Sequence, residues 1–148
     1  MKTDRQNIPI LCADYNPFDI ELFKVAFSGL AEKHRIDVAR DGQEVLDYLF
    51  YRGEFADRNR ELPAAILLDI KMPRLDGIEA LRAIRALEDY RELPIIMITS
   101  SEMTRDVIDC YELGANAYVV KPIDFNDFVS LVESLYRFWT YLNKFPES

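Results

Sequence analysis

Residues 64–77 read AAILLDIKMPRLDG, and this stretch decides the fold. The run Ala64 to Leu68 is short, continuous and apolar, which is typical of a strand buried on both faces of a sheet. Asp69 directly follows this run, and the pair Asp76-Gly77 then starts a segment whose apolar residues recur at helical spacing. A strand, a polar loop and a helix in this order form one unit of a parallel sheet.

Further apolar runs of the same kind recur along the chain. They are Ile8 to Ala13, Ile36 to Ala39, Ile95 to Ile98 and Ala117 to Val120. Segments with helical spacing, such as Ile78/Leu81/Ile84, lie between them. Strands that alternate with helices are joined by right-handed crossovers. The sequence therefore predicts an α/β fold, a doubly wound five-stranded parallel sheet with helices on both faces.

Capping residues stand where these helices should begin and end. Asn16-Pro17 combines a capping side chain with a proline at the first helical position, and Asp19 follows in the first turn, where it meets the helix dipole. Asp124 is placed to start the last helix, and Gly114 stands where a left-handed residue would end the helix before it.

Length and composition indicate one domain over residues 1–148, with a core of about 8–135 and a C-terminal helical extension of about 136–148. The net charge of -8 repels a phosphate backbone, so we expect no nucleic-acid partner. No apolar run approaches the roughly 18 residues that cross a bilayer, so we expect no membrane partner and a cytoplasmic protein. Cys12 and Cys110 form no metal or disulfide pattern and are predicted to be buried thiols.

Two segments exceed what five strand and helix units need. The charged stretch from Phe50 to Pro63 is predicted to be a solvent-exposed helix extension and loop. The last helix, from Asp124 to about Asn143, would be roughly 30 Å long and would outrun the sheet. Its end carries the aromatic pair Phe138-Trp139, which favours a partner or self-association surface, although simple overhang is the alternative.

Polar side chains follow four of the predicted strands. Asp14, Asp69, Thr99 and Lys121 each stand just beyond an apolar run. The carboxyl ends of parallel strands meet at one edge of the sheet, where ligands bind, so these groups should converge. Two carboxylates there would repel, and Mg²⁺ relieves such repulsion. A carboxylate can also attack phosphorus, with the cation and a lysine neutralising the phosphoryl oxygens and a hydroxyl hydrogen-bonding one of them.

These motifs resemble a receiver domain of a two-component response regulator. LLDIKMPRLDG is similar to that family's phosphoacceptor motif, MITSS to its switch hydroxyl, and AYVVKP to its Lys-Pro pair with an aromatic residue three positions earlier. The resemblance runs from about Ile8 to Leu135 and implies the flavodoxin-like strand order 2-1-3-4-5.

The resemblance also implies a role for each site residue. Asp69 would accept a phosphoryl group from the phosphohistidine of a sensor histidine kinase, and Thr99 and Lys121 would hold that group. Tyr118 would be the switch residue, with plain packing as the alternative, and Mg²⁺ would be bound by Asp14, Asp69 and Lys71. The Lys121-Pro122 bond is expected to be cis.

A narrower resemblance links the charged insert, the NPFDIELF opening and the LYRFW helix to the stand-alone regulators paired with bacterial phytochromes. It implies a phytochrome-type kinase as partner and no DNA-binding output domain, so the signal would leave by docking to another protein. A homodimer through the fourth helix, the fifth strand and the last helix is expected.

One position departs from the family pattern. Receiver domains usually carry two adjacent acids after the first strand, whereas this chain has Asp14 followed by Tyr15. A register with Ala13 and Asp14 in those places needs an inserted residue before Asn16. Either register removes one carboxylate and weakens Mg²⁺ binding. The alternative function is therefore a pseudo-receiver, an interaction module that works without phosphorylation.

Two other classes fit the residues less well. A phosphatase that forms an aspartyl phosphate would need an acid two residues after Asp69, where Lys71 stands, so we expect no enzyme beyond self-catalysed phosphoryl transfer and hydrolysis. A flavodoxin-like carrier would need a loop rich in Gly, Ser and Thr after the first strand, whereas Asp14 and Asp19 would repel a phosphate there.

Overall fold

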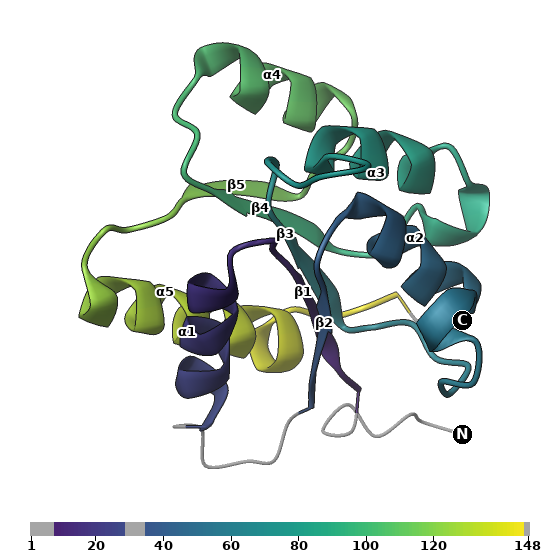
Figure 1. Ribbon diagram of the computed structural model, residues 1–148, viewed down its shortest axis with the longest axis horizontal. Coiled ribbons are helices and arrows are strands. Elements are labelled where there is room, and N and C mark those ends of the chain that lie inside the picture. Colours follow the sequence, from purple (N-terminus) through teal and green to yellow (C-terminus); the bar gives the residue numbers. More distant parts are fainter. Residues whose placement is uncertain (1–7, 29–34, 147–148) are drawn as a thin grey trace.

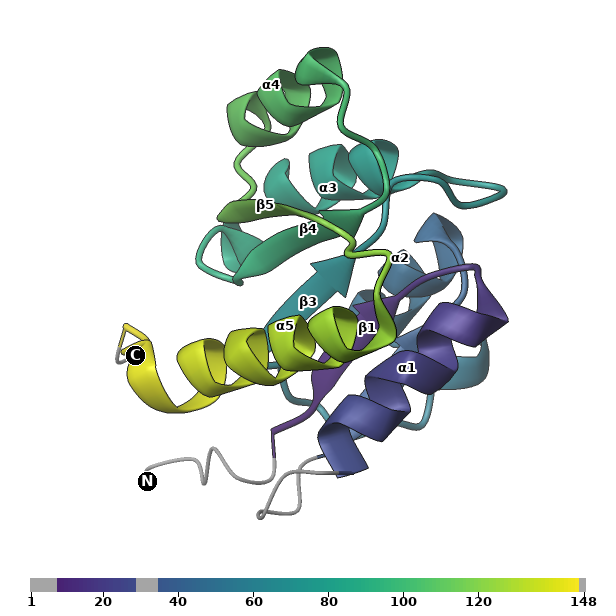
Figure 2. The ribbon, with the colours of Figure 1, turned by 90° about the vertical axis from the view of Figure 1, so that its left-hand side faces the viewer.

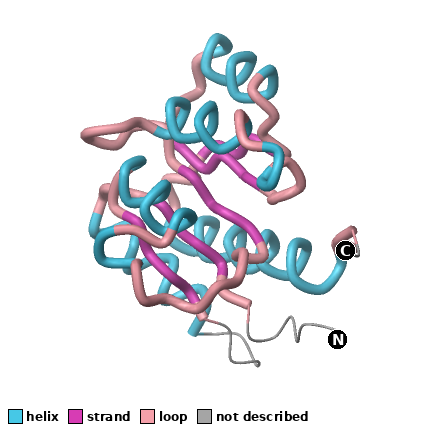
Figure 3. The backbone as a smooth tube through the Cα atoms, turned by 90° about the vertical axis from the view of Figure 1, so that its right-hand side faces the viewer, coloured by secondary structure: helices cyan, strands magenta, loops and turns pink. Residues whose placement is uncertain are grey.

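The computed structural model describes residues 8–28 and 35–146. Its five strands form a single parallel sheet in the order β2-β1-β3-β4-β5, which confirms the predicted topology. The strands lie inside the molecule, with helices around them (Figure 3). The strands are β1 (Ile10–Ala13), β2 (Ile36–Ala39), β3 (Ala65–Leu68), β4 (Ile95–Thr99) and β5 (Ala117–Val120). Each predicted run matches its strand to within about two residues at either end.

Helices cover both faces of the sheet (Figure 1). One face carries α1 (Pro17–Ser28) and α5 (Phe125–Arg137), which pack side by side. The other carries α2 (Gly42–Phe50), α3 (Gly77–Arg85) and α4 (Thr104–Glu112). Shorter helical turns are η2 (Gly53–Phe55), η3 (Glu88–Tyr90) and the π-helix η4 (Phe138–Leu142). This arrangement is the predicted doubly wound fold.

The central strands are apolar at every position because their two faces pack into two separate hydrophobic cores. In β1, Leu11 and Ala13 belong to the core under α2 and α3, whereas Ile10 and Cys12 belong to the core under α1 and α5. Successive side chains of a strand point to opposite faces, so a strand buried on both sides needs apolar residues at every position. The edge strands differ from the prediction, because most residues of β2 and β5 are only partly buried.

The predicted helix ends are confirmed. The Asp76 side chain accepts from the backbone N–H of Glu79, whose side chain in turn accepts from the N–H of Asp76, and this capping box starts α3. Asp124 caps α5 in the same way through the N–H of Asp127. Gly114 has φ of +100°, the left-handed conformation expected after α4.

The insert between α2 and β3 is more tightly packed than predicted. The Phe55 ring lies 5.3 Å from the ring of Tyr48 and packs against the core. The Arg58 guanidinium stacks over the Tyr48 ring at 3.7 Å, and its Nε donates to the Tyr48 carbonyl oxygen at 2.7 Å. The arginine side chain is charged and planar and has donors at fixed angles. Arg58 can therefore hold the insert against the core, although the charged sequence of the insert predicted that it is solvent-exposed.

The C-terminal helix continues past the core as predicted but changes type. It is α-helical to Arg137 and continues as η4, and its end extends away from the sheet (Figure 2). Trp139 packs against the core under α1 and α5, whereas the Phe138 side chain is 45% exposed and that of Leu142 is 74% exposed. The last two residues of the predicted extension lie outside the described residues.

Cys12 and Cys110 are both free and fully buried, as expected. None of the helices in the described ranges is long and apolar enough to cross a membrane.

Candidate functional site

Backbone hydrogen bonds continue each strand by one residue and place the functional side chains at one edge of the sheet. The Asp14 N–H donates to the Ala39 carbonyl, and the Asp69 N–H donates to the Ala13 carbonyl, each at 3.0 Å. The Lys121 N–H donates to the Thr99 carbonyl at 2.8 Å. The four predicted residues therefore stand at the carboxyl ends of neighbouring strands, where a parallel sheet binds ligands.

The Lys121 ammonium is the centre of the site. Its Nζ lies 2.6 Å from Asp14 Oδ2, 2.8 Å from Asp19 Oδ2 and 3.0 Å from Asp69 Oδ2. An ammonium group has three N–H donors, so these three carboxylates occupy all of them. The side chain of Lys121 is only 10% exposed, and that of Asp14 is 1% exposed.

Burial and mutual charge set the protonation of this cluster. Burial raises the pKa of Asp14 to about 6, and the Asp69 charge acts in the same direction, although the Lys121 hydrogen bond opposes both. Burial acts to lower the pKa of Lys121, but the Asp69 charge and the hydrogen bonds that Lys121 donates to Asp14 and Asp19 outweigh it and raise that pKa well above its usual value. Lys121 is therefore a permanent cation beside the Asp69 carboxylate.

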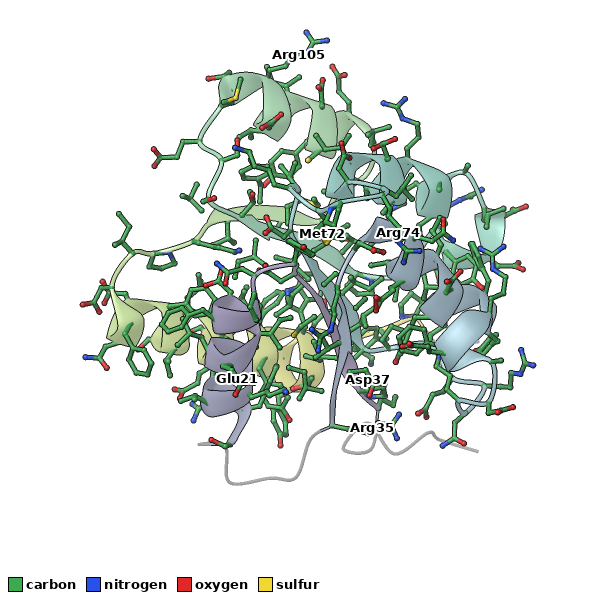
Figure 4. The ribbon with its side chains drawn as sticks, viewed as in Figure 1. Glu21, Arg35, Asp37, Met72, Arg74 and Arg105 are labelled. Atoms are coloured by element: carbon green, nitrogen blue, oxygen red, sulfur yellow. The ribbon has the colours of Figure 1, made fainter. Side chains whose placement is uncertain are left out.

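The loop after β3 is built tightly around Asp69. The Ile70 N–H donates to Asp69 Oδ1 at 2.7 Å, which fixes the carboxylate and leaves Oδ2 toward Lys121. The Gly77 N–H donates to the Ile70 carbonyl at 2.8 Å, so α3 starts directly against this loop. A Cβ at Gly77 would lie 1.9 Å from the Asp69 carbonyl oxygen, and only glycine fits there. Figure 4 labels Met72 and Arg74, which belong to the same loop.

On the other side of the site, hydrogen bonds join the predicted hydroxyl and switch residues. Thr99 is fully buried, and its Oγ1 accepts from the Ser101 N–H at 3.4 Å. The Tyr118 hydroxyl donates to the Ser101 carbonyl at 3.0 Å, and Ser101 Oγ donates to Asp106 of α4 at 2.6 Å. Ser101 thus links Thr99 to Tyr118 and to α4.

The response regulator receiver domain family matches residues 10–133 of this sequence, which is most of the chain. The chain belongs to the receiver domain family. The match begins with β1 and ends inside α5, so it contains every predicted site residue.

Relatives of this receiver domain include regulators linked to phytochromes. It is 31% identical to response regulator Rcp1 of Synechocystis over 139 residues, which cover 93% of each protein, and a solved Mn²⁺-bound form of Rcp1 superimposes with a TM-score of 0.86. The phosphorylated cyanobacterial phytochrome response regulator RcpA has a TM-score of 0.88 at 28% identity, covering 95% of this chain and 99% of that one. RPA3017, a response regulator in red light signaling of R. palustris, has a TM-score of 0.84 at 34% identity with the same coverage.

Sequence reasoning missed Asp19 as a member of the site. The loss of an acid at Tyr15 predicted a pocket one carboxylate short, yet the receiver domain still gathers three, because Asp19 reaches Lys121 from the first turn of α1. Tyr15 itself is 61% exposed. The signal was present in the sequence, since Asp19 stands one helical turn beyond the Asp14-Tyr15 pair, but it had been assigned only to the helix dipole.

The predicted Mg²⁺ ligands lie in this receiver domain as follows. Asp14 and Asp69 are brought together by Lys121, while residue Lys71 is exposed. Among residues 8–28 and 35–146, no set of three or more His, Cys, Asp and Glu side chains is grouped as a metal centre. The three carboxylates surround the ammonium instead. Their oxygen chemistry suits a hard cation, and with one lysine they leave two unbalanced negative charges, so the donor set fits a divalent ion.

The expected cis Lys121-Pro122 bond is absent. No peptide bond within the described ranges is cis, so this bond is trans. A prolyl bond favours trans by only about 0.5–1 kcal/mol, which makes the isomer a property of the local packing.

Proposed function

We propose that this receiver domain is a single-domain response regulator, which accepts a phosphoryl group on Asp69 from the phosphohistidine of a sensor histidine kinase and signals by docking to another protein. The observation that carries the proposal is the 3.0 Å contact between Lys121 Nζ and Asp69 Oδ2 in a buried site. A carboxylate that is fixed by a backbone N–H and faced by a permanent cation is arranged to become an acyl phosphate.

The transfer itself is a simple displacement. Asp69 Oδ2 attacks phosphorus, the bond from phosphorus to the kinase imidazole nitrogen breaks, and the imidazole leaves. Lys121 and the Thr99 hydroxyl would then hold the oxygens of the transferred group. We propose that movement of the Thr99 hydroxyl toward the phosphoryl group would change its 3.4 Å hydrogen bond from the Ser101 N–H, and that Ser101 would pass this change to Tyr118 and α4.

A divalent cation is part of the proposal. Asp14 and Asp69 would hold Mg²⁺, with the predicted third position at Lys71, and the ion would neutralise negative charge on the transferring group. The Mn²⁺-bound form of the relative Rcp1 supports this assignment.

The kinase is proposed to be of the phytochrome type, because the relative RcpA is a phytochrome regulator and RPA3017 acts in red light signaling. We propose the cytoplasm as the place of this exchange. We also propose that the domain is no enzyme beyond catalysing its own phosphorylation and dephosphorylation.

The direct test is incubation with acetyl phosphate and Mg²⁺, followed by intact mass measurement. We expect the gain of one phosphoryl group, and we expect Asp69→Asn to abolish it. Asp57→Asn, which removes an exposed carboxylate in the insert, is the matched control and should be modified like the wild type. An adduct that survives Asp69→Asn would reject Asp69 as the acceptor.

The pseudo-receiver is the second candidate function, and Tyr15 is the observation that favours it. A 61% exposed tyrosine stands where the family carries an acid, and a phenol is a poor ligand for a hard cation. If neither Mg²⁺ nor Mn²⁺ supports formation of the acyl phosphate, this candidate replaces the first.

A homodimer through α4, β5 and α5 belongs to the first proposal. Exposed apolar side chains on this face support it, notably Met103 at 63% and Tyr111 at 50% exposure, together with Phe138 and Leu142 at the helix end. Sedimentation at high micromolar concentration, with and without beryllofluoride as phosphoryl analogue, should show a dimer. A strictly monomeric species in both conditions contradicts it.

A further inference from the structure

The Asp19 side chain reaches Lys121, although its role in the first turn of α1 does not require that contact. Asn16 starts α1, because its Oδ1 accepts from the Phe18 N–H at 2.9 Å and its carbonyl accepts from the Ile20 N–H. An acid in the first turn needs only to face the helix N-terminus to gain from the dipole. Asp19 instead contacts Lys121, which is 102 residues away in the sequence, at 2.8 Å. Its side chain is only 17% exposed, so the contact is largely shielded from solvent.

The contact changes the charge of the phosphorylation pocket. Asp14, Asp69 and Lys121 alone would carry a net charge of minus one, since the ammonium cancels one carboxylate. With Asp19 included the net charge is minus two, which matches a divalent cation. The acid that Tyr15 fails to supply after the first strand is thus replaced by Asp19 from the first turn of α1.

The contact also determines which oxygens remain for a cation. Lys121 has three donors, and Asp19 accepts one of them. If Asp19 were absent, that donor would turn to Asp14 or Asp69, whose outer oxygens already face the ammonium at 2.6 Å and 3.0 Å. Asp19 therefore takes up one of the three donors, which would otherwise add to the hydrogen bonds on the two carboxylates that the proposed function assigns to the metal.

We propose that Asp19 is the third acid of the phosphorylation pocket, a positioning residue that offsets the charge of Lys121 and so lets Asp14 and Asp69 bind a divalent cation despite Tyr15. This inference rests on the proposed function. It goes beyond that function in assigning part of the cation affinity to Asp19, to which the resemblance gives no role at the site.

The test measures Mn²⁺ binding to the full chain by electron paramagnetic resonance, in which free Mn²⁺ gives the signal. We expect Asp19→Asn to weaken Mn²⁺ binding by about tenfold or more, because it removes one charge close to the bound ion in a buried site. Asp19→Glu keeps the charge and should stay within about threefold of the wild type.

Glu21→Gln is the matched control. Glu21 lies on the same helix, is labelled in Figure 4, and is paired with Lys24 at 3.4 Å with 68% of its side chain exposed. Glu21→Gln removes the same charge at the surface, where solvent and salt screen it, so we expect the Mn²⁺ affinity to change by less than about twofold. An equal loss of Mn²⁺ affinity in Glu21→Gln and Asp19→Asn would overturn the inference, since net charge alone would then explain it.

Restoring the missing acid gives a second arm. In a Tyr15→Asp background Asp19→Asn should cost less than about threefold in Mn²⁺ affinity, because the pocket regains its carboxylate from the loop. A full tenfold loss in that background overturns the replacement role. Urea unfolding of each variant checks folding, and Asp19→Ser is measured if Asp19→Asn does not fold.

The outcomes separate this inference from the proposed function. Suppose that the wild type gains a phosphoryl group and that Asp19→Asn binds Mn²⁺ as tightly as the wild type. The proposed function then stands, and the role of Asp19 is overturned. A wild type that binds Mn²⁺ in an Asp19-dependent way but is never phosphorylated supports the role of Asp19 and rejects the function.

Discussion

Gly77→Ala tests whether the start of α3 positions the phosphoacceptor. The added Cβ would meet the Asp69 carbonyl oxygen at 1.9 Å, and the Asp69 carbonyl carbon at 2.8 Å. Both are backbone atoms, so no rotamer change relieves the contact. Moving that oxygen from 1.9 Å to the 3.4 Å at which ordinary contact begins requires a displacement of about 1.5 Å.

Two opposing terms set the loss of stability. Overpacking a tight site costs about 1–3 kcal/mol, while alanine gains up to about 1 kcal/mol over glycine in a helix, and less at its first residue. We expect the free energy of unfolding to fall by about 2 kcal/mol. Urea unfolding followed by the fluorescence of Trp139, the only tryptophan, measures it.

The same displacement should disable the site. Asp69 Oδ2 now lies 3.0 Å from Lys121 Nζ, and a shift of about 1 Å in a reacting group costs roughly 100-fold in rate. We therefore expect phosphorylation by acetyl phosphate, measured on folded protein, to slow by about two orders of magnitude.

Gly114→Ala is the control. It is also strained, since Gly114 has φ of +100°, but it precedes β5 and so lies toward the amino ends of the strands, whereas the site lies at their carboxyl ends. It should lose stability and keep the wild-type rate per folded molecule. If Gly77→Ala loses stability but keeps that rate as well, α3 does not position Asp69 and the reasoning fails.

Further predictions concern stability. Lys121→Met leaves the carboxylates around it without a counter-ion and should lower the free energy of unfolding by about 3 kcal/mol in urea; a loss below about 1 kcal/mol would contradict the pairing. Arg58→Ala should lose about 2 kcal/mol and expose the insert to trypsin, and Arg58→Lys should not rescue it, because an ammonium cannot both stack on Tyr48 and donate at fixed angles. Burial acts to raise the pKa of Asp41, but the Arg74 hydrogen bond at 2.7 Å and the Glu44 N–H outweigh it and hold that pKa below 3.8. Arg74→Ala should therefore lower the free energy of unfolding by its full amount above pH 3.8. This difference from the wild type should shrink as the pH falls through the folded pKa of Asp41, which acid unfolding curves of the two proteins will show.

The fold could be predicted because its signals are local. Each central strand must be apolar at every position to serve two cores, and such runs are visible without knowledge of the partners. Caps such as Asp76 and Asp124 act within one turn. The edge strands were predicted less well, because the burial of β2 and β5 depends on having a neighbour on one side only.

The site residues that follow a strand end were predicted from the sequence. The residue that a long-range contact brings to the site was missed. Asp14, Asp69, Thr99 and Lys121 follow apolar runs, so their meeting follows from the parallel sheet. Asp19 is brought in by the packing of α1 beside α5, which no periodicity in the sequence reveals. The packing of the insert was missed for the same reason, since a charged stretch gives no hint that Arg58 stacks on an aromatic ring.

The burial of the strands indicates which side of the site moves. Asp14 and Asp69 follow β1 and β3, whose residues are all buried and which have strand neighbours on both sides. Tyr118 belongs to β5 and Lys121 directly follows it, and β5 is an edge strand that pairs only with β4 and is partly exposed along its whole length. Elements with less burial and fewer partners open at lower free energy. Asp69, the proposed acceptor, therefore lies on the more rigid half of the sheet, and the residues proposed to respond to a new phosphoryl group lie on the half that can shift, next to α4 and the exposed apolar face.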